Sequence, residues 1–255
     1  MTFRPCIVVP VFNHGDGAAA LMAHFAPLDL RVFFVNDGSA DDTALRLAEI
    51  EKQYPAVRVV GHAENRGKGA AVVSGLRAAH DEGFSHALQI DADGQHDAGD
   101  IPRFLALAER NPGAVIAGQP VFDASVPTGR LIARYLTHVW IWVETLSFAI
   151  RDSMCGFRVY PLAPVIGVAD RTRLGRRMDF DPEILVRLHW DGVAIMSLPT
   201  RVIYPEGGSS HFRLWLDNWL ITRMHIRLVF GMLWRVLLFR TGKFGGPGAR
   251  RKAAG

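Results

Sequence analysis

The chain has 255 residues, of which 49% are hydrophobic and 21% are charged, and this composition predicts a folded domain with a buried core. Collagen-like, coiled-coil and fully disordered chains are excluded. The net charge is +4, but the part after Phe212 holds nine Lys or Arg residues against one acidic residue, a distribution that argues against a nucleic-acid-binding domain and suits an anionic membrane surface.

Short β-rich runs alternate with amphipathic segments through the first half of the chain. The runs are apolar on both faces, as in Ile7-Val8-Val9, which indicates strands covered on both sides. We therefore predict an α/β fold: a mostly parallel, Rossmann-like sheet flanked by helices. Ligands of such sheets bind beyond the carboxyl ends of the strands, so the loops there are the candidate functional segments. Strands are expected at 6–11, 31–35, 57–61, 86–90 and 114–118, and helices at 17–25, 42–53, 69–80 and 100–109.

The loop after the first strand contains Gly15-x-Gly17-x-x-Ala20, which matches a dinucleotide-binding fingerprint, and Asp37 ends the next strand. A nicotinamide-dependent oxidoreductase is therefore one alternative. Against it, Phe12-Asn13-His14 separates the strand from the first glycine, whereas the fingerprint needs that glycine in the turn itself.

Polar residues follow the second and third strands. A turn and helix cap formed by Ser39 or Asp41 would explain the capping in this segment. It leaves open why Asp37 lies at the carboxyl end of the strand, where it could accept hydrogen bonds from a nucleobase. The later Asn65-Arg66-Gly67-Lys68-Gly69 lacks the spacing of a P-loop. It still predicts a phosphate site formed by backbone N–H groups with Arg66 or Lys68.

The loop after the fourth strand carries two carboxylates one residue apart, Asp91 and Asp93, followed by Gln95. Such carboxylates repel each other unless a cation lies between them. Three hard oxygen ligands suit Mg²⁺ or Mn²⁺ with positions left open for a diphosphate. The spacing is not that of an EF-hand, because the required glycine and distant Glu are missing.

Six ordered motifs between about residues 5 and 212 make the chain resemble a family 2 glycosyltransferase of the GT-A fold. The last two resemble the branch that glycosylates dolichyl or undecaprenyl phosphate. The motifs are Pro10-Val11-Phe12-Asn13, Val35-Asn36-Asp37-Gly38-Ser39, Asn65-Arg66-Gly67-Lys68-Gly69, Asp91-Ala92-Asp93-Gly94-Gln95, Asp152-Ser153-Met154-Cys155-Gly156-Phe157-Arg158 and Arg177-Met178-Asp179-Phe180-Asp181-Pro182-Glu183.

The resemblance implies a donor site for a nucleotide diphosphate sugar. Phe12 would pack on the donor's base, Asp37 would hydrogen-bond it, and Arg66 or Lys68 would lie near the diphosphate. Asp91, Asp93 and Gln95 would hold the metal. Pro10, Asn13, Asp91 and Ala92 complete the expected donor-binding set.

The resemblance also implies transfer with inversion, by in-line attack of the acceptor oxygen on the anomeric carbon. Asp152, Asp181 and Glu183 are the candidates for orienting the acceptor or acting as base. Acceptor binding is expected at four residues, of which the two arginines would clamp a phosphate: Arg158, Arg177, Ser210 and His211.

Three residues depart from the family pattern. Asn36 replaces the first Asp of Asp-Asp-Gly-Ser, while His14 and Phe12 replace the Glu and Tyr of Pro-x-Tyr-Asn-Glu. Asp37 is retained, so donor binding is expected, whereas the identity of the base stays open. Gly207 to His211 stands where polyprenyl-phosphate enzymes often have Gly-x-Ser-Lys.

We expect three regions: a glycosyltransferase domain at 1–212, an amphipathic helix at 213–240 and a basic, disordered tail at 241–255. In the helix, charges recur at steps of four and tryptophans occupy the opposite side, as in helices that lie in a membrane surface. A core-packing or dimer helix is the alternative. A second interfacial helix is expected at 131–150. His138, Glu144 and Arg235 interrupt the longest apolar stretches, so no transmembrane helix is expected.

The N-terminus lacks the features of a signal peptide. The two cysteines, Cys6 and Cys155, are too few for a disulfide framework and lack zinc-ligand spacing, which predicts buried free thiols in a reducing cytoplasm. The sequence thus predicts a peripheral enzyme at the cytoplasmic face of the inner membrane. It would transfer a hexose to a lipid-linked acceptor, with polyprenyl phosphate first and another lipid or small hydroxylated acceptor second. A non-catalytic membrane adaptor is the remaining alternative.

Overall fold

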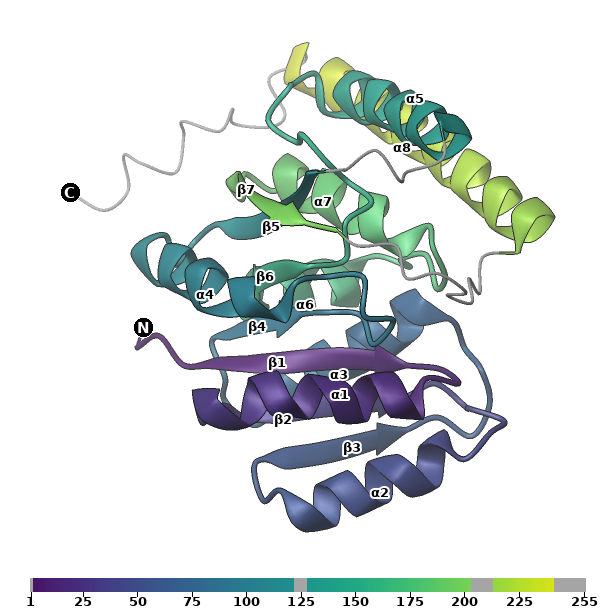
Figure 1. The fold of residues 1–255 in the computed structure, drawn as a ribbon. Coiled ribbons are helices and arrows are strands. Elements are labelled where there is room, and N and C mark those ends of the chain that lie inside the picture. The colour runs from purple at the N-terminus through teal and green to yellow at the C-terminus, as the bar shows by residue number, and fades with distance from the viewer. Residues whose placement is uncertain (1, 122–127, 203–212, 241–255) are drawn as a thin grey trace.

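The computed structural model describes residues 2–121, 128–202 and 213–240, with the backbone alone at 128–133, 239 and 240 (Figure 1). Seven strands form one sheet in the order β3-β2-β1-β4-β6-β5-β7. Every neighbouring pair is parallel except those of β6, which runs antiparallel to both β4 and β5. The strands are β1 (Pro5–Val11), β2 (Val32–Asn36), β3 (Val57–Gly61), β4 (His86–Gln89), β5 (Val115–Val121), β6 (Arg158–Pro161) and β7 (Ile195–Arg201).

Helices cover both faces of the sheet, because its strands are apolar on both sides. On one face, Val8 and Phe33 pack in a core that includes residues of α3, α6, α7 and α8. On the other, Ile7 and Phe34 pack with residues of α1, α2 and α4. The helices are α1 (Gly15–Phe25), α2 (Thr43–Gln53), α3 (Lys68–Asp81), α4 (Ile101–Arg110), α5 (Thr128–Thr145), α6 (Leu162–Arg171), α7 (Phe180–Trp190) and α8 (Leu214–Arg240), with 3₁₀ turns η1 (Ala26–Leu28) and η2 (Ala98–Asp100).

The predicted sheet and its five strands are confirmed, with shifts of at most three residues at their ends; the largest is at β5, which ends at Val121. Both cysteines are free and buried, as predicted. The predicted helix at 131–150 starts earlier, and it ends at Thr145 because Leu146 adopts a left-handed φ of 50°. The elements β6, α6, α7 and β7 were not predicted.

Helices α5 and α8 lie side by side at one end of the molecule (Figure 1). Within the described residues, neither these nor any other helix has the length and apolarity needed to cross a membrane.

Helix α8 carries apolar residues on two sides. Met224 and Leu228 are buried in the core, whereas Trp215 and Phe230 are exposed at 88% and 68%. Two of its polar residues also face the protein: Asp217 is fully buried and accepts a hydrogen bond from Arg177 at 2.7 Å, and Arg235 donates to the backbone oxygen of Trp190 at 2.6 Å. An ordinary surface helix has one apolar stripe, which faces the core.

Candidate active site

The loops that follow β1 and β2 are tied to each other at the carboxyl edge of the sheet. The backbone N–H of Asn13 donates to Ser39 Oγ at 3.0 Å, and Asn13 Oδ1 accepts from the Ala40 N–H at 2.9 Å. Asn13 adopts a φ of 54°, a conformation that Asn tolerates better than most residues. Pro10 is buried, whereas Phe12 is half-buried beside these loops. The first two predicted donor-binding segments therefore form one rigid unit.

Asp37 is almost fully buried, and its carboxylate is occupied by its own chain. Oδ1 accepts from the Arg66 N–H at 2.9 Å and lies 2.7 Å from His62 Nδ1, while Oδ2 accepts from the Gly67 N–H at 2.8 Å. These bonds join the loop after β2 to the start of α3. His62 gave no sequence signal, because a single histidine after a strand matches no motif.

The glycines at the start of α3 allow close packing against residues 175–180. A Cβ on Gly67 would lie 2.4 Å from the Arg176 oxygen, and one on Gly69 would lie 2.4 Å from Phe180 Cβ. The Arg176 oxygen also accepts from the Ala70 N–H at 3.0 Å. Several N–H groups of the predicted phosphate loop therefore already have partners within the chain. The remaining contribution to a phosphate site comes from the side chains of Arg66 and Lys68.

Lys68 connects two of the predicted site residues. Its Nζ lies 2.6 Å from Asp91 Oδ2 and 3.0 Å from Asp181 Oδ2. Burial alone would lower the pKa of Lys68, but the carboxylates of Asp181 and Asp91 raise it above its ordinary value. Gly156 makes room for this cluster, since a Cβ there would lie 2.6 Å from Asp91 Oδ2. Segments far apart in sequence thus meet around one ammonium group.

The predicted metal ligands fit a hard cation. Asp91 Oδ1 is buried and has no hydrogen-bond partner, and Asp93 Oδ1 accepts only the backbone N–H of Gln95 at 3.0 Å. Burial and the charge of Asp91 raise the pKa of Asp93, which is the effect expected of two carboxylates without an ion between them. The described residues contain no group of three or more His, Cys, Asp or Glu side chains placed to bind a metal. The protein would therefore supply two carboxylates and an amide.

The glycines of the dinucleotide-like motif have a packing explanation. A Cβ on Gly17 would lie 2.0 Å from the backbone oxygen of Ala92, and one on Gly15 would lie 2.7 Å from Arg46 Cδ. Gly17 therefore lets α1 contact the loop that carries Asp91 and Asp93. Ala92 is itself buried at this contact.

Two of the three candidate bases are fully paired. Asp152 accepts two hydrogen bonds from Arg134 at 2.6 and 2.7 Å. Glu183 has no exposed surface and is bonded to Arg187 and Arg227. This pairing argues against Asp152 and Glu183 as free bases. Asp181 Oδ1 is buried and accepts no hydrogen bond, and the nearest cationic group to it is the Arg158 guanidinium at 3.9 Å.

Arg158 has a different role from the one predicted. The side chain is fully buried and donates to the backbone oxygens of Cys155, Asp181 and Ser153, each at 2.7 Å, and to the Tyr160 hydroxyl at 3.0 Å. Because no guanidinium surface is exposed, Arg158 cannot clamp an acceptor phosphate in this structure. It fixes the loop before β6 against the start of α7.

Arg177, the other predicted clamp, is half-buried and pairs with Asp217 of α8. Ser210 and His211 lie outside the described residues. Arg134, which neutralises Asp152, was missed because its partner comes from a separate segment and no local motif signals the pair.

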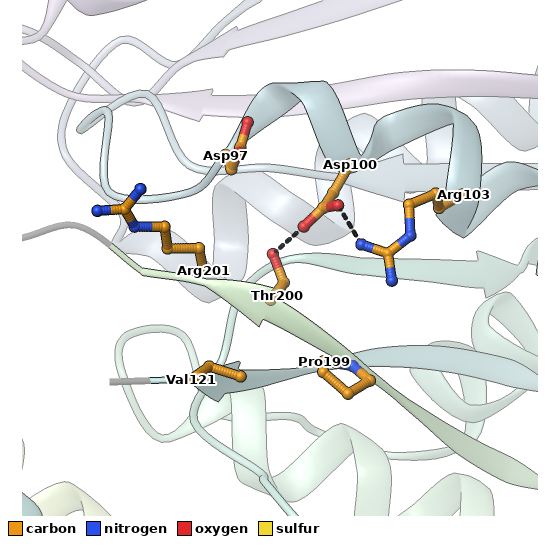
Figure 2. Close-up of a pocket in the computed structure, with 7 residues that line it drawn as sticks. All are labelled: Asp97, Asp100, Arg103, Val121, Pro199, Thr200 and Arg201. Atoms are coloured by element: carbon orange, nitrogen blue, oxygen red, sulfur yellow. Dashed lines mark hydrogen bonds and ion pairs between the residues drawn. The ribbon is translucent and has the colours of Figure 1, made fainter. Parts of the chain in front are cut away.

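A cavity of about 490 Å³ lies between the segment of η2 and the start of α4 on one side and the paired ends of β5 and β7 on the other (Figure 2). The Asp100 carboxylate joins residues on both sides of the cavity: it accepts hydrogen bonds from Thr200 Oγ1 at 2.8 Å and from Arg103 at 2.5 Å. The carboxylates Asp91 and Asp93 do not line this cavity. It therefore stands apart from the Lys68 cluster.

The mixed seven-stranded sheet with helices on both faces is the GT-A fold. Residues 6–162 match the model of the family described as glycosyl transferase family 2. The chain belongs to that family.

Relatives in sequence include a UDP-N-acetylglucosamine–dolichyl-phosphate N-acetylglucosaminyltransferase of Methanococcus voltae, 21% identical over 83% of this chain and 86% of its own. A polyprenol monophosphomannose synthase of Mycolicibacterium smegmatis is 26% identical over 62% of each chain. The predicted resemblance to polyprenyl-phosphate glycosyltransferases is thus confirmed at the level of named relatives.

Solved structures show the same fold. Staphylococcus aureus TarS in complex with UDP-GlcNAc superposes with a TM-score of 0.58 and 14% identity, covering 88% of this chain and 66% of TarS. The Pyrobaculum calidifontis mannosyltransferase PcManGT, in complex with GDP-Man and Mn²⁺, gives 0.54 and 16%, covering 80% and 58%. The chain spans about three fifths of the length of PcManGT and of the mycobacterial synthase.

Proposed function

We propose that this glycosyltransferase moves a hexose from a nucleotide diphosphate sugar to a lipid-linked acceptor, with polyprenyl phosphate as the first choice, and that it inverts the anomeric centre. One observation carries the proposal: Asp91 keeps a buried, unpartnered oxygen beside Asp93 while Lys68 holds its other oxygen. The named relatives act on dolichyl phosphate or polyprenol, and the solved neighbours bind UDP-GlcNAc or GDP-Man.

The residues of the cluster fit the parts of this reaction. Asp91, Asp93 and Gln95 would hold Mg²⁺ or Mn²⁺, which would stabilise the negative charge of the departing nucleoside diphosphate. Lys68 adds a fixed positive charge beside that position. Asp181, anchored by Lys68, would orient the attacking group with its remaining oxygen.

The pairing of the other carboxylates favours a phosphate acceptor over a hydroxyl acceptor. A hydroxyl needs a base to take its proton, whereas a phosphate is already anionic at neutral pH. Asp152 and Glu183 are both held by arginines, which leaves Asp181 as the one predicted base with an oxygen that accepts no hydrogen bond. Transfer to another lipid or a small hydroxylated acceptor would depend on Asp181.

The exposed face of α5 and α8 supports contact with a membrane. Trp140, Trp215, Trp219 and Trp234 are each about half exposed or more, and tryptophan is enriched at membrane interfaces. We propose peripheral attachment through this face, at the cytoplasmic side of the inner membrane, where a lipid-linked acceptor would meet a cytoplasmic donor.

Calorimetry tests the donor part of the proposal. UDP, GDP and NAD are titrated into the protein with Mn²⁺ or with chelator, and into Asp93→Ala. We expect one nucleoside diphosphate to bind in a metal-dependent way, with binding lost in Asp93→Ala. Asp81→Ala, on the exposed end of α3, is the matched control and should bind normally. NAD binding that ignores chelator and mutation would contradict the proposal.

A further inference from the structure

A second cavity, of about 410 Å³, lies where α8 meets the segment before α7 and Arg66, which precedes α3. Six arginines line it, against a single carboxylate, Asp179. They come from three separate parts of the chain: Arg66, Arg173, Arg176, Arg177, Arg223 and Arg227. We call these residues and the space between them the arginine pocket.

The charge of the arginine pocket is only partly compensated. Arg177 pairs with Asp217 and Arg227 pairs with Glu183. Arg66, Arg173, Arg176 and Arg223 are exposed, and their side chains form no hydrogen bond or ion pair with any residue that the structure describes. Gathering like charges is unfavourable without a counter-charge, so the pocket is built for an anion. Guanidinium groups suit phosphate in particular, because they bind it through two parallel hydrogen bonds.

The pocket is separate from the candidate reaction centre. Lys68, Asp91, Asp93 and Asp181 do not line it. Between the arginine pocket and the candidate reaction centre, Gly67 and Gly69 pack against residues 175–180. This contact is so close that a Cβ on either glycine would overlap its neighbours. A phosphate held in the arginine pocket is therefore not the one that attacks the sugar.

The arginine pocket borders the exposed apolar face of α8, and this position indicates which kind of phosphate it would bind. Arg223 and Arg227 lie one helical turn apart, and the neighbouring Trp219 and Ile226 are exposed at 58% and 53% as part of the apolar face. With that face in a bilayer, arginines at its border would lie at the level of the lipid headgroups.

We propose that the arginine pocket binds the phosphate headgroup of an anionic bilayer phospholipid that is not itself glycosylated. The inference rests on the membrane contact in the proposed function. It adds a headgroup site that makes attachment depend on lipid charge, and it orients the reaction centre relative to the surface through α8 and the start of α3.

Vesicle co-sedimentation of the full chain tests this site. Three vesicles are compared: phosphatidylcholine alone, phosphatidylcholine mixed with phosphatidylglycerol, and phosphatidylcholine containing a trace of undecaprenyl phosphate. The pocket variant is Arg173→Gln with Arg223→Gln. The matched control, Lys52→Gln with Arg110→Gln, removes the same charge from exposed positions at the ends of α2 and α4. Both arginines of the pocket variant are exposed, so a thermal melt should match that of the wild type.

We expect the pocket variant to lose affinity for phosphatidylglycerol vesicles by about fivefold per arginine, roughly 30-fold for the pair, while its binding to phosphatidylcholine stays unchanged. The control pair should lose much less. Arg173→Lys with Arg223→Lys should recover part of the loss, since charge is kept and bidentate geometry is not.

Three results would overturn the inference: equal losses in the pocket and control pairs, an equal loss on neutral vesicles, or a loss confined to the undecaprenyl phosphate vesicles. The last would assign the pocket to the acceptor. Inorganic phosphate is added as a competitor to wild-type protein bound to each charged vesicle. Failure of phosphate to displace the protein supports a lipid headgroup as the ligand, whereas displacement at low phosphate concentration would indicate a site for free phosphate. Wild-type protein that binds no vesicle would contradict the membrane contact itself, and sugar transfer is not measured in any arm.

Discussion

The carboxylates around the candidate active site differ in how far the chain neutralises them. Asp152 and Glu183 are each bonded to arginine and to backbone N–H groups. Asp91 has Lys68 on one oxygen and nothing on the other, and Asp181 shares the same lysine. An unpaired buried oxygen costs stability, and Asp91 and Asp181 each carry one beside Lys68.

Lys68 should be needed for donor binding. In Lys68→Met, Asp91 and Asp181 lose the charge they share, and a diphosphate loses a fixed cation nearby. We expect donor affinity to fall by about 10- to 100-fold, measured by calorimetry with Mn²⁺ present. Lys52→Met, on the exposed side of α2, should bind as the wild type does. Unchanged affinity in Lys68→Met would remove the lysine from the proposed site.

Asp152 should make the free energy of unfolding depend on pH in the acid range. Burial alone would raise its pKa, but the contacts with His138 and Arg134 outweigh burial and hold the pKa well below its usual range. A carboxyl whose pKa is lowered by folding stabilises the fold above its unfolded pKa of about 4 and loses that contribution as the pH falls toward the folded pKa.

Urea unfolding of Asp152→Asn measures this contribution. At neutral pH the variant should be about 3 kcal/mol less stable than the wild type, because Arg134 stays buried without its partner. The difference should shrink steadily below about pH 4. A difference that stays constant down to pH 2 would show that the carboxylate charge is not what the arginine stabilises.

At the scale of elements, the contact between α1 and the Asp91–Gln95 loop depends on one missing side chain. In Gly17→Ala the new Cβ would overlap the Ala92 oxygen, so the helix or the loop must move. We expect a loss of about 1–3 kcal/mol in unfolding free energy and weaker Mn²⁺-dependent donor binding. Gly113→Ala adds the same methyl group where nothing lies within 4 Å, and should change neither. Normal donor binding in Gly17→Ala would show that binding does not depend on the contact between α1 and the Asp91–Gln95 loop.

The first half of the fold was predictable because each strand is an apolar run followed by a polar loop. The second half was not. Helix α7 is buried on almost every side, so its sequence has no amphipathic period, and β6 is a strand of four residues that begins with a fully buried arginine. Such elements are defined by partners distant in sequence.

The candidate site shows the same division. Lys68 and Asp91 could be placed near each other from motifs, since the loops of parallel strands meet at one edge. The contact of Lys68 with Asp181 could not, because Asp181 lies in α7, which follows another helix. The hydrogen bonds of Asp37 and Arg158 to their own chain could not be predicted, because Asp and Arg side chains serve equally for binding ligands and for holding loops in place. Burial and hydrogen bonding decide which of these two roles a side chain has, and neither can be predicted from a local sequence pattern.

At the scale of the whole molecule, α5 and α8 give one end of the enzyme a surface with many exposed large apolar side chains. Trp215→Ser with Trp219→Ser should weaken binding to phosphatidylcholine vesicles by at least tenfold in co-sedimentation, because two interfacial aromatic side chains are removed. Leu45→Ser, which removes a side chain 70% exposed on α2, is the control and should bind normally. Equal binding by all three proteins would place the membrane contact elsewhere.

The buried ion pairs of α8 also bear on the order in which the enzyme matures. Glu183 has no exposed surface, and one of its oxygens is neutralised by Arg227, which is synthesised 44 residues later. Before α8 is made, Glu183 already has Arg187 and the Gly175 N–H as partners, whereas Arg177 still lacks the carboxylate of Asp217. Docking of α8 supplies Asp217 to Arg177 and Arg227 to Glu183, and the same step places the exposed apolar residues of α8 beside those of α5. A newly made molecule would thus complete these two ion pairs and its apolar surface in a single step.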